Sequence, residues 1–337
     1  MTRSPSSQTG LYPLRFAPIY EYRPWGGKRL AGLLGDSLQD DDTVGEAWVL
    51  SDREGYLSRV VEGPLEGTSL RDLMEQFPDE MLGKMAKRFT RFPLLLKFLD
   101  ARRMLSVQVH PSDRHVDYLP GGETGKTEAW VILEAEPQCR IYAGLKPDTT
   151  PALLRRALDD KTVTEHLSYF TPKPGDGVFL AAGTVHAFGD GVVVFEVQQN
   201  SDVTYRLYDW DHVDPHTGRP RDLQVEAAIA CIDFSQGAVA PVQALLEETE
   251  PVIRERLFDS EHFCLWRLHG HLPCSVGAPG SMRALVCIAG TGQLEHNGET
   301  YAVKMGDVIV VPAVVGQCVF RPRGVVSLLE IALPEER

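Results

Sequence analysis

The chain has 337 residues, of which 43% are hydrophobic, and a formal net charge of −13 at pH 7. That length exceeds the usual single core and predicts two domains or one large α+β body. The negative charge argues against nucleic acid and anionic membranes as partners, because both attract basic patches. The amino terminus has no apolar signal segment, and the six cysteines form no C-x-x-C pair, so we expect a cytoplasmic protein. The sequence carries no signal for an oligomeric state.

Most of the expected elements, taken in chain order, are short β-strands separated by glycine and proline. They fall at 46–51, 93–100, 105–110, 127–134, 177–182, 191–199 and 204–210. Segments near 66–92 and 150–160 instead carry apolar residues at helical spacing, with Thr68 or Ser69 capping the first and Pro151 in the first turn of the second. Many short strands with glycine turns are typical of a β-barrel or sandwich.

Two stretches of the sequence repeat one pattern. "PGDGVFLAAGTVHAF" and "MGDVIVVPAVVGQCVF" share Gly-Asp, an apolar strand, a turn of small residues and a second strand. Counting 11 residues from the shared glycine reaches His186 in the first copy and Gln317 in the second. In the strand that precedes each copy, Glu128 of the first copy matches Arg283 of the second. We therefore predict two similar barrels whose matched positions carry different chemistry.

Six strings, in this order, resemble those of the bacterial type of zinc-dependent mannose-6-phosphate isomerases. They are "YRPWGG" at 22–27, "GEAWVLS" at 45–51, "LSVQVHPSD" at 105–113, "GKTEAW" at 125–130, "AAGTVHA" at 181–187 and "QNSDVTYRLYDW" at 199–210. The resemblance runs from about Pro18 to the carboxyl end. One departure is Ala181, where the family usually has proline; it alters the rigidity of a turn and no ligand.

The resemblance implies a fold class: mainly β with α insertions, built from two cupin barrels of jelly-roll type plus a small helical segment. We expect a flexible tail over 1–17. A catalytic cupin domain should follow over 18–235, with a helical insertion near 66–92 and a helix near 150–160. Residues 236–337 should form a degenerate cupin domain without metal.

The strand at 105–110 should turn Ser106, Gln108 and His110 to one face, because side chains alternate along a strand. Inside a barrel such polar groups cost several kcal/mol unless they are partnered. The resemblance implies that a metal is the partner, held by Gln108, His110, Glu128 and His186. Two imidazoles, a carboxylate and an amide oxygen suit Zn²⁺, Mn²⁺ or Fe²⁺, and the family implies one Zn²⁺ per chain. Without the family match, hydrogen-bonded core side chains would explain the same residues.

The implied activity is the reversible aldose–ketose isomerisation of mannose 6-phosphate and fructose 6-phosphate through an enediol. Arg206 is the candidate for stabilising enediolate charge, because a guanidinium stays charged; pairing with Asp209 or Asp211 is its alternative. Matched family positions suggest Lys126 for ring opening and Asp202 or Glu196 for proton transfer, each with an alternative role in orienting its neighbours.

Two further residues are candidates for substrate contact. Ser106 lies on the same strand face as Gln108. Trp25, which is followed by two glycines, would form part of the pocket wall. The histidines His269 and His271 resemble a second metal site only superficially, since the matching barrel lacks its Glu and distal His.

Two other functions remain open on these residues. One is a metal-dependent cupin oxygenase, which Gln108 weakens by occupying a position that such sites leave open. The other is a sugar-binding cupin with a structural metal, which leaves Lys126, Asp202 and Arg206 without a task. The partner expected from the family is a small sugar phosphate.

Overall fold

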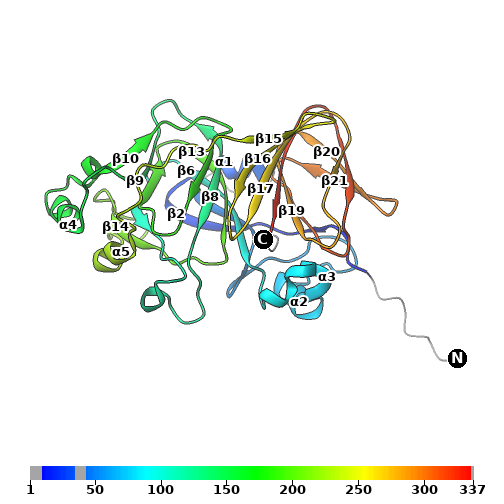
Figure 1. Ribbon diagram of the computed structural model, residues 1–337, viewed down its shortest axis with the longest axis horizontal. Helices are drawn as coiled ribbons and strands as arrows, with labels where there is room; N and C mark the ends of the chain where they lie inside the picture. The colour runs from blue at the N-terminus through cyan, green and yellow to red at the C-terminus, as the bar shows by residue number, and fades with distance from the viewer. Residues whose placement is uncertain (1–9, 35–42, 335–337) are drawn as a thin grey trace. The chain divides into compact units, whose positions relative to one another are not determined.

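The computed structural model describes residues 10–34 and 43–334. These residues form two compact units, each built from separate stretches of chain. The middle unit comprises residues 18–56 and 93–244, and the terminal unit comprises 10–17, 57–92 and 245–334. The first nine residues of the expected tail lie outside the described residues. Both units consist mainly of β-strands, as the sequence predicted (Figure 1).

The first sheet of the middle unit has the strand order β11-β8-β13-β6-β2-β3 and is antiparallel. Its strands are β2 (Ile19–Gly27), β3 (Val44–Leu50), β6 (Leu94–Ala101), β8 (Glu128–Ala135), β11 (Gly177–Leu180) and β13 (Val192–Gln199). Every residue of β6 and β13 is buried, which fits their run of leucines and valines at the centre of a sheet. A two-residue pair, β4 (Asp52–Arg53) and β5 (Tyr56–Leu57), follows β3.

The second sheet of the middle unit has the order β10-β9-β12-β7-β14. Its strands are β7 (Val107–Val109), β9 (Arg140–Leu145), β10 (Leu167–Phe170), β12 (His186–Gly189) and β14 (Tyr205–Tyr208). Val107 and Val109 are completely buried in an apolar cluster with side chains of α4 (Pro151–Asp159) and α5 (Val225–Cys231). These two helices lie beside this sheet (Figure 1). The opposite face of β7 is therefore free to turn its polar side chains toward the first sheet.

The interior between the two sheets of the middle unit is apolar at one end. Trp130 and Ile132 of β8, Val194 of β13, and Ile141 and Phe188 of the second sheet form one buried cluster. Residues from both sheets thus share a core, as in a jelly roll. Side chains alternate between inward and outward positions along the whole of each strand. The inward residues further along the same strands therefore line the other end of the interior.

The helix predicted near 150–160 is confirmed as α4. The Thr150 side chain accepts a hydrogen bond from the amide of Leu153, and Pro151 opens the first turn. Two short helices of the middle unit, α1 (Arg29–Leu34) and α5, were not expected from the sequence. Two 3₁₀ turns, η2 (Val116–Tyr118) and η3 (Val163–His166), complete the unit.

The terminal unit contains a seven-stranded sheet, ordered β1-β22-β19-β24-β17-β16-β15, and a four-stranded sheet, ordered β18-β23-β20-β21. The strands are β1 (Leu14–Arg15), β15 (Leu245–Glu248), β16 (Ile253–Asp259), β17 (Cys264–Gly270), β18 (Cys274–Val276), β19 (Arg283–Ala289), β20 (Thr291–His296), β21 (Glu299–Lys304), β22 (Val308–Val311), β23 (Cys318–Pro322) and β24 (Val326–Ala332). Its helices are α2 (Leu70–Gln76), α3 (Pro78–Leu82) and the 3₁₀ helix η1 (Gly83–Arg88). Ser69 caps α2 in a capping box with Asp72.

Strand register repeats between the two units. In the middle unit Glu128 pairs with Leu180 across β8 and β11. In the terminal unit Arg283 pairs with Val311 across β19 and β22. Glu128 and Arg283 are each the first residue of their strand. The strand pairing therefore supports the equivalence of these two residues that the sequence offsets indicated.

Three boundaries differ from the expected ones. The division expected between residues 235 and 236 falls between 244 and 245. The described part of the expected tail is not flexible, because Leu14 and Phe16 are buried and β1 pairs with β22. The helical segment near 66–92 belongs to the terminal unit and not to the domain around it in sequence. The amide of Ala313 donates to the carbonyl of Met81, and Met81 itself is fully buried. The apolar face of a helix must pack against a hydrophobic core, but the position of the helix in the chain does not show which of the two cores it packs against.

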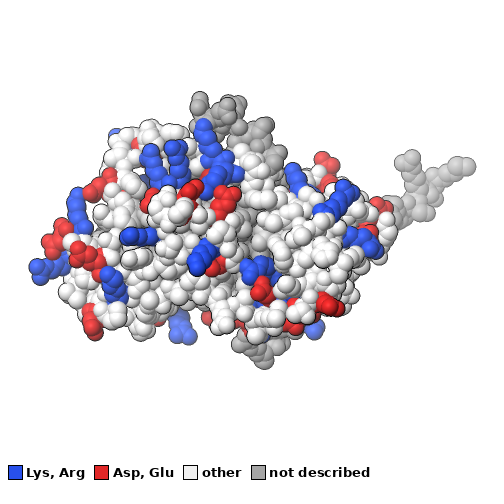
Figure 2. Space-filling view, turned by 90° about the horizontal axis from the view of Figure 1, so that it is seen from above, with Lys and Arg blue, Asp and Glu red and all other residues white. Residues whose placement is uncertain are grey.

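Surface charge is mixed on the face shown in Figure 2, where acidic and basic side chains lie next to one another. Among the described residues, no helix is both long and apolar enough to cross a bilayer.

Candidate active site

The polar end of the middle unit's interior is formed by strands that are apolar on the same face at their other end. Along β8 the inward positions run from Ile132 through Trp130 to Glu128, and along β13 they run from Val194 to Glu196. The exposed fractions of Glu128 and Glu196 are only 1% and 3%. Buried carboxylates require partners, so each must meet a cation or a donor within the fold.

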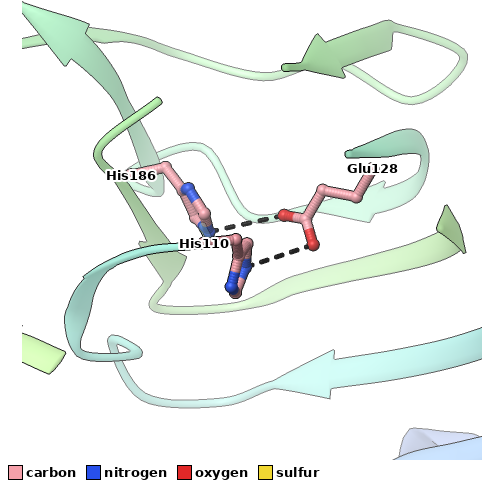
Figure 3. A group of neighbouring side chains, drawn as sticks. All are labelled: His110, Glu128 and His186. Atoms are coloured by element: carbon pink, nitrogen blue, oxygen red, sulfur yellow. Dashed lines mark ion pairs between the residues drawn. The ribbon is translucent and has the colours of Figure 1, made fainter. Parts of the chain in front are cut away.

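Three buried side chains, His110, Glu128 and His186, converge on one point (Figure 3). His110 Nε2 lies 3.3 Å from one carboxylate oxygen of Glu128, and His186 Nε2 lies 3.3 Å from the other. His186 sits on β12, directly beside Gln108 of β7. The strand pairing therefore brings together Gln108 and His186, which are 78 positions apart in the chain.

The orientation of both imidazoles leaves their Nε2 lone pairs directed at Glu128. His110 Nδ1 lies 2.9 Å from the carbonyl oxygen of Val203, and His186 Nδ1 lies 2.9 Å from that of Thr184. A ring nitrogen beside a carbonyl must carry the proton, which leaves Nε2 as an acceptor. Burial lowers the pKa of both histidines, so the neutral form that binds metals is favoured. Two lone pairs and a carboxylate facing one another are the donor set that a divalent cation fits.

Gln108 and Ser106 lie beside this group, as the predicted alternation requires. The Gln108 amide nitrogen is 3.3 Å from His186 Nε2, and Ser106 donates to the Gln108 carbonyl oxygen at 3.2 Å. The amide can turn to present its oxygen instead. Gln108 thus completes a set of four potential ligands within the described residues.

Lys126 is buried and lies against the acidic side of the site. Its ammonium is 2.6 Å from Glu128, 3.5 Å from Glu196 and 3.1 Å from His110 Nε2. Burial would raise the pKa of Glu128, but the charge of Lys126, together with His186 and hydrogen bonds from Glu196 and Lys126, lowers that pKa to about 2. Burial raises the pKa of Glu196 to about 7. The two carboxylates therefore differ in protonation near neutral pH, which is the property that proton transfer needs.

Lys97 and Glu46 also belong to the site, although the sequence interpretation missed them. Lys97 pairs with Asp202 at 3.2 Å and with Glu46 at 3.4 Å, and its ammonium lies 4.5 Å from the centre of the Trp48 ring. Lys97 interrupts the apolar stretch "PLLLKFLD", and Glu46 lies within the buried strand "VGEAWVL". A charge in the middle of a buried strand is the signal that could have found them.

Arg206 lies on β14, paired with Gln108 of β7. The Nε atom of Arg206 is buried without a hydrogen-bond partner, and burial lowers the pKa of the Arg206 guanidinium. The alternative of pairing with Asp209 or Asp211 is wrong. Asp209 is held by Arg221, and Asp211 pairs with Lys161 at 2.6 Å.

A cavity of about 450 Å³ opens onto these groups. Among the predicted site residues, its lining includes Trp25, Gln108, Lys126, Glu128, Glu196, Asp202 and Arg206. Lys97, Glu46, Arg23, Tyr22, Asp214 and Arg221, which were not predicted, line it too. Ser106, His110 and His186 are not part of the lining. Ser106 contacts Gln108, and the two histidines contact Glu128. A cavity of this volume suits a small polar molecule.

The histidines of the terminal unit are not part of a comparable group. His269 is exposed and bonds to Ser327 at 2.8 Å, and His271 is exposed as well. Within residues 10–34 and 43–334, the cluster of His110, Glu128 and His186 is the one group of three potential ligands that the structure brings together.

Facing antiparallel sheets around an internal group of histidines and a carboxylate define a cupin-like enzyme with a potential metal site. Residues 14–126 match the family model for the catalytic domain of type I phosphomannose isomerase. The chain is 33% identical over 309 residues to mannose-6-phosphate isomerase ManA of Bacillus subtilis, covering 90% of this chain and 94% of that protein. It belongs to the mannose-6-phosphate isomerase family.

Two further similarities agree with this membership. The mannose-6-phosphate isomerase of Streptococcus mutans is 33% identical over 292 residues, covering 86% of this chain and 88% of that protein. The crystal structure of the mannose 6-phosphate isomerase from Bacillus subtilis superposes with a TM-score of 0.86 at 28% identity, covering 95% of this chain and 99% of that one. The fold class and the family that the sequence predicted are therefore confirmed.

Proposed function

We propose that this chain interconverts mannose 6-phosphate and fructose 6-phosphate in the cavity of the middle unit. The observation that carries the proposal is the convergence of His110, Glu128 and His186 beside Lys126 and Glu196 in a chain of this family. Aldose–ketose isomerisation moves a proton between adjacent carbons, so it needs a positioned acid or base and a stabiliser for enediolate charge.

The metal in this proposal is Zn²⁺, one per chain, held by Gln108, His110, Glu128 and His186. The two Nε2 atoms and the Glu128 carboxylate are already directed at a common point, and such donors suit zinc. When bound, zinc would polarise substrate oxygens as a Lewis acid.

Lys126 and Glu196 are the proposed proton carriers nearest to the ligands. Lys126 lies between two carboxylates and is well placed to donate a proton during ring opening. Glu196, whose pKa burial raises to about 7, holds or releases a proton near neutral pH and suits the transfer between C1 and C2. Asp202 is the second candidate for this transfer, although its pairing with Lys97 favours a role in holding that lysine.

The remaining predicted residues would contact the substrate. The buried, unpartnered Nε of Arg206 is suited to enediolate charge, because a guanidinium that lacks a carboxylate keeps its full field for the ligand. Trp25 lines the cavity and would wall the sugar. Ser106 would act through the Gln108 amide, to which it donates.

An assay for fructose 6-phosphate formation, run with metal analysis on the same preparation, tests the proposal. Turnover that tracks bound metal supports it. Oxygen consumption without isomerisation would favour the cupin oxygenase, and metal binding with neither activity would favour a sugar-binding cupin. Cytoplasmic localisation belongs to the same proposal, since all six cysteines are free thiols.

A further inference from the structure

The cationic side chains that line the cavity differ in their partners. Lys126 is paired with Glu128 and Glu196, and Lys97 with Glu46 and Asp202. Arg23 is paired with Glu46 at 2.7 Å and Glu21 at 3.2 Å. Each of these three cations is thus paired with two carboxylates, whereas Arg221 pairs with one, Asp209, and Arg206 forms no ion pair among the described residues. The remaining two are Arg206 and Arg221, and the proposed chemistry gives Arg221 no task.

Arg221 is held in a fixed orientation by Asp209. Its Nε donates to one carboxylate oxygen of Asp209 at 2.8 Å, and its Nη2 donates to the other. The Asp209 side chain is only 7% exposed, so this fork cannot swing freely. A guanidinium bound along one edge keeps its Nη1 hydrogens for a ligand, and Arg221 lines the cavity.

The loop that carries Arg221, residues 209–222, is tied to the middle unit at several points. Tyr22 of β2 donates to Asp214 at 3.3 Å, and its ring stacks on His216 with 4.0 Å between ring centres. At the end of the loop, Gln224 accepts from the amide of Arg206 at 3.1 Å and returns a backbone hydrogen bond at 2.9 Å. The loop therefore presents Arg221 to the same cavity that Arg206 faces.

Arg206 and Arg221 act on each other electrostatically. Burial is the main cause of the lowered pKa of Arg206, and the positive charge of Arg221 adds to it. Among the described residues Arg206 forms no ion pair. The two carboxylates that attract it from a distance are already bound elsewhere, Asp209 to Arg221 and Asp202 to Lys97. An anion in the cavity would relieve the repulsion between the two guanidiniums.

We propose that Arg221, positioned by Asp209, binds the phosphate of the substrate and selects sugar phosphates over free sugars. The inference rests on the proposed function, because it assigns the second end of the same substrate. Planar guanidiniums bind phosphate oxygens through paired hydrogen bonds, and a pre-oriented one loses little freedom on binding. Asp209 is a positioning residue, since it binds Arg221 and does not line the cavity.

The experiment compares Arg221→Gln, Arg221→Lys and Asp209→Asn with the exposed loop control Arg219→Gln. For Arg221→Gln we expect kcat/KM for mannose 6-phosphate to fall about 10- to 100-fold, mostly through KM, because a charge-assisted hydrogen bond is lost. Turnover of free mannose, measured at high concentration, should not change. Arg221→Lys should recover part of the loss, and Arg219→Gln should match the wild type.

Binding of a non-reacting pair, glucitol 6-phosphate and glucitol, measured by calorimetry, gives a readout separate from turnover. Wild type should prefer the phosphorylated polyol, and Arg221→Gln should reduce that preference at least 10-fold, as for one charged hydrogen bond. An unchanged preference would overturn the inference, as would a fall in kcat at constant KM. If the wild type itself fails to isomerise mannose 6-phosphate, the proposed function fails instead. If Asp209→Asn does not fold, the Arg221 variants still decide the question.

Discussion

The middle and terminal units place different side chains at matching points of the same strand register. The matched pairs are Glu46 with Arg254, Lys97 with Trp266, Glu128 with Arg283, and Glu196 with Glu330. Three of the four pairs change charge, and the one that does not keeps a buried glutamate. The same β framework thus supports two interiors of different electrostatic character.

The buried polar groups of the terminal unit form ion pairs and hydrogen bonds with one another. Glu330 pairs with Arg254 at 2.7 Å, accepts from the amide of Gly277 at 2.7 Å and lies 4.0 Å from Arg283. Both arginines also lie over the ring of Trp266. In the middle unit, by contrast, two imidazole lone pairs and Glu128 face one another. The comparison teaches that one register can hold either a group of potential metal ligands or a core whose inward groups pair among themselves.

The strongest test of this contrast removes the middle unit's imidazoles. His110→Ala and His186→Ala should each lose bound metal and at least 10³-fold in activity, because the neutral imidazole supplies both the ligand and the site geometry. Metal analysis and the isomerase assay measure the two losses together. Treatment with a chelator should abolish turnover, and added metal should restore it. Full activity in metal-free protein would contradict the assigned role.

The next largest effect should come from the unpaired arginine of the middle unit. Arg206→Ala should lower kcat by roughly 10²-fold while bound metal stays constant, because Arg206 would stabilise charge that grows during the reaction. Steady-state kinetics with metal analysis checks this. A rise in KM alone would move Arg206 to phosphate binding beside Arg221.

A third prediction concerns the self-satisfied core of the terminal unit. Glu330→Gln should lower the free energy of unfolding by about 3 kcal/mol, because it leaves Arg254 and Arg283 with less compensation for their buried charge. The kcat of the folded protein should stay within about twofold, since the assigned site residues are in the middle unit. Denaturant titration gives the first value and the isomerase assay the second.

The control for this test is Glu295→Gln, which breaks a more exposed pair with Arg321. It should change stability by no more than about 1 kcal/mol. Equal effects of the two substitutions would show that Glu330 has no special role in the terminal core.

The smallest expected effect concerns the histidines of the terminal unit. His269→Ala and His271→Ala should leave metal content at about one ion per chain, because Arg283 repels a cation and Gln317 alone is a weak donor. Metal analysis after dialysis is the measurement. Two retained ions, one of them lost in either variant, would mean that the terminal unit has a metal site of its own.

Local patterns in the sequence were sufficient for much of the fold. The alternation from Ser106 to His110 predicted which side chains face the core, and Val107 and Val109 are completely buried on the other face. Pro151 marked the first turn of α4. These features depend on residues close together in the chain, and for that reason sequence spacing describes them well.

Features that depend on long-range pairing were harder to predict. The segment that contains Met81 was assigned to the wrong unit, because its partner strands follow more than 200 residues later. Lys97 and Glu46 were missed, since each looks like a stray charge until the sheet brings them together. Arg221 was missed because it lies in a loop with no periodic pattern. For these residues, the partner and not the local sequence determines the role.

The pairing of β1 with β22 has a consequence for synthesis on the ribosome. Leu14 is among the first described residues to be made, yet its partner Val310 is among the last. At about 5–20 residues per second, this strand waits roughly 15–60 s for its partner. All residues of the middle unit have been synthesised once residue 244 has emerged from the ribosome. The terminal unit is complete only after its last strands, which follow residue 244, have been made. Nascent chains should therefore acquire the cavity before β1 is paired.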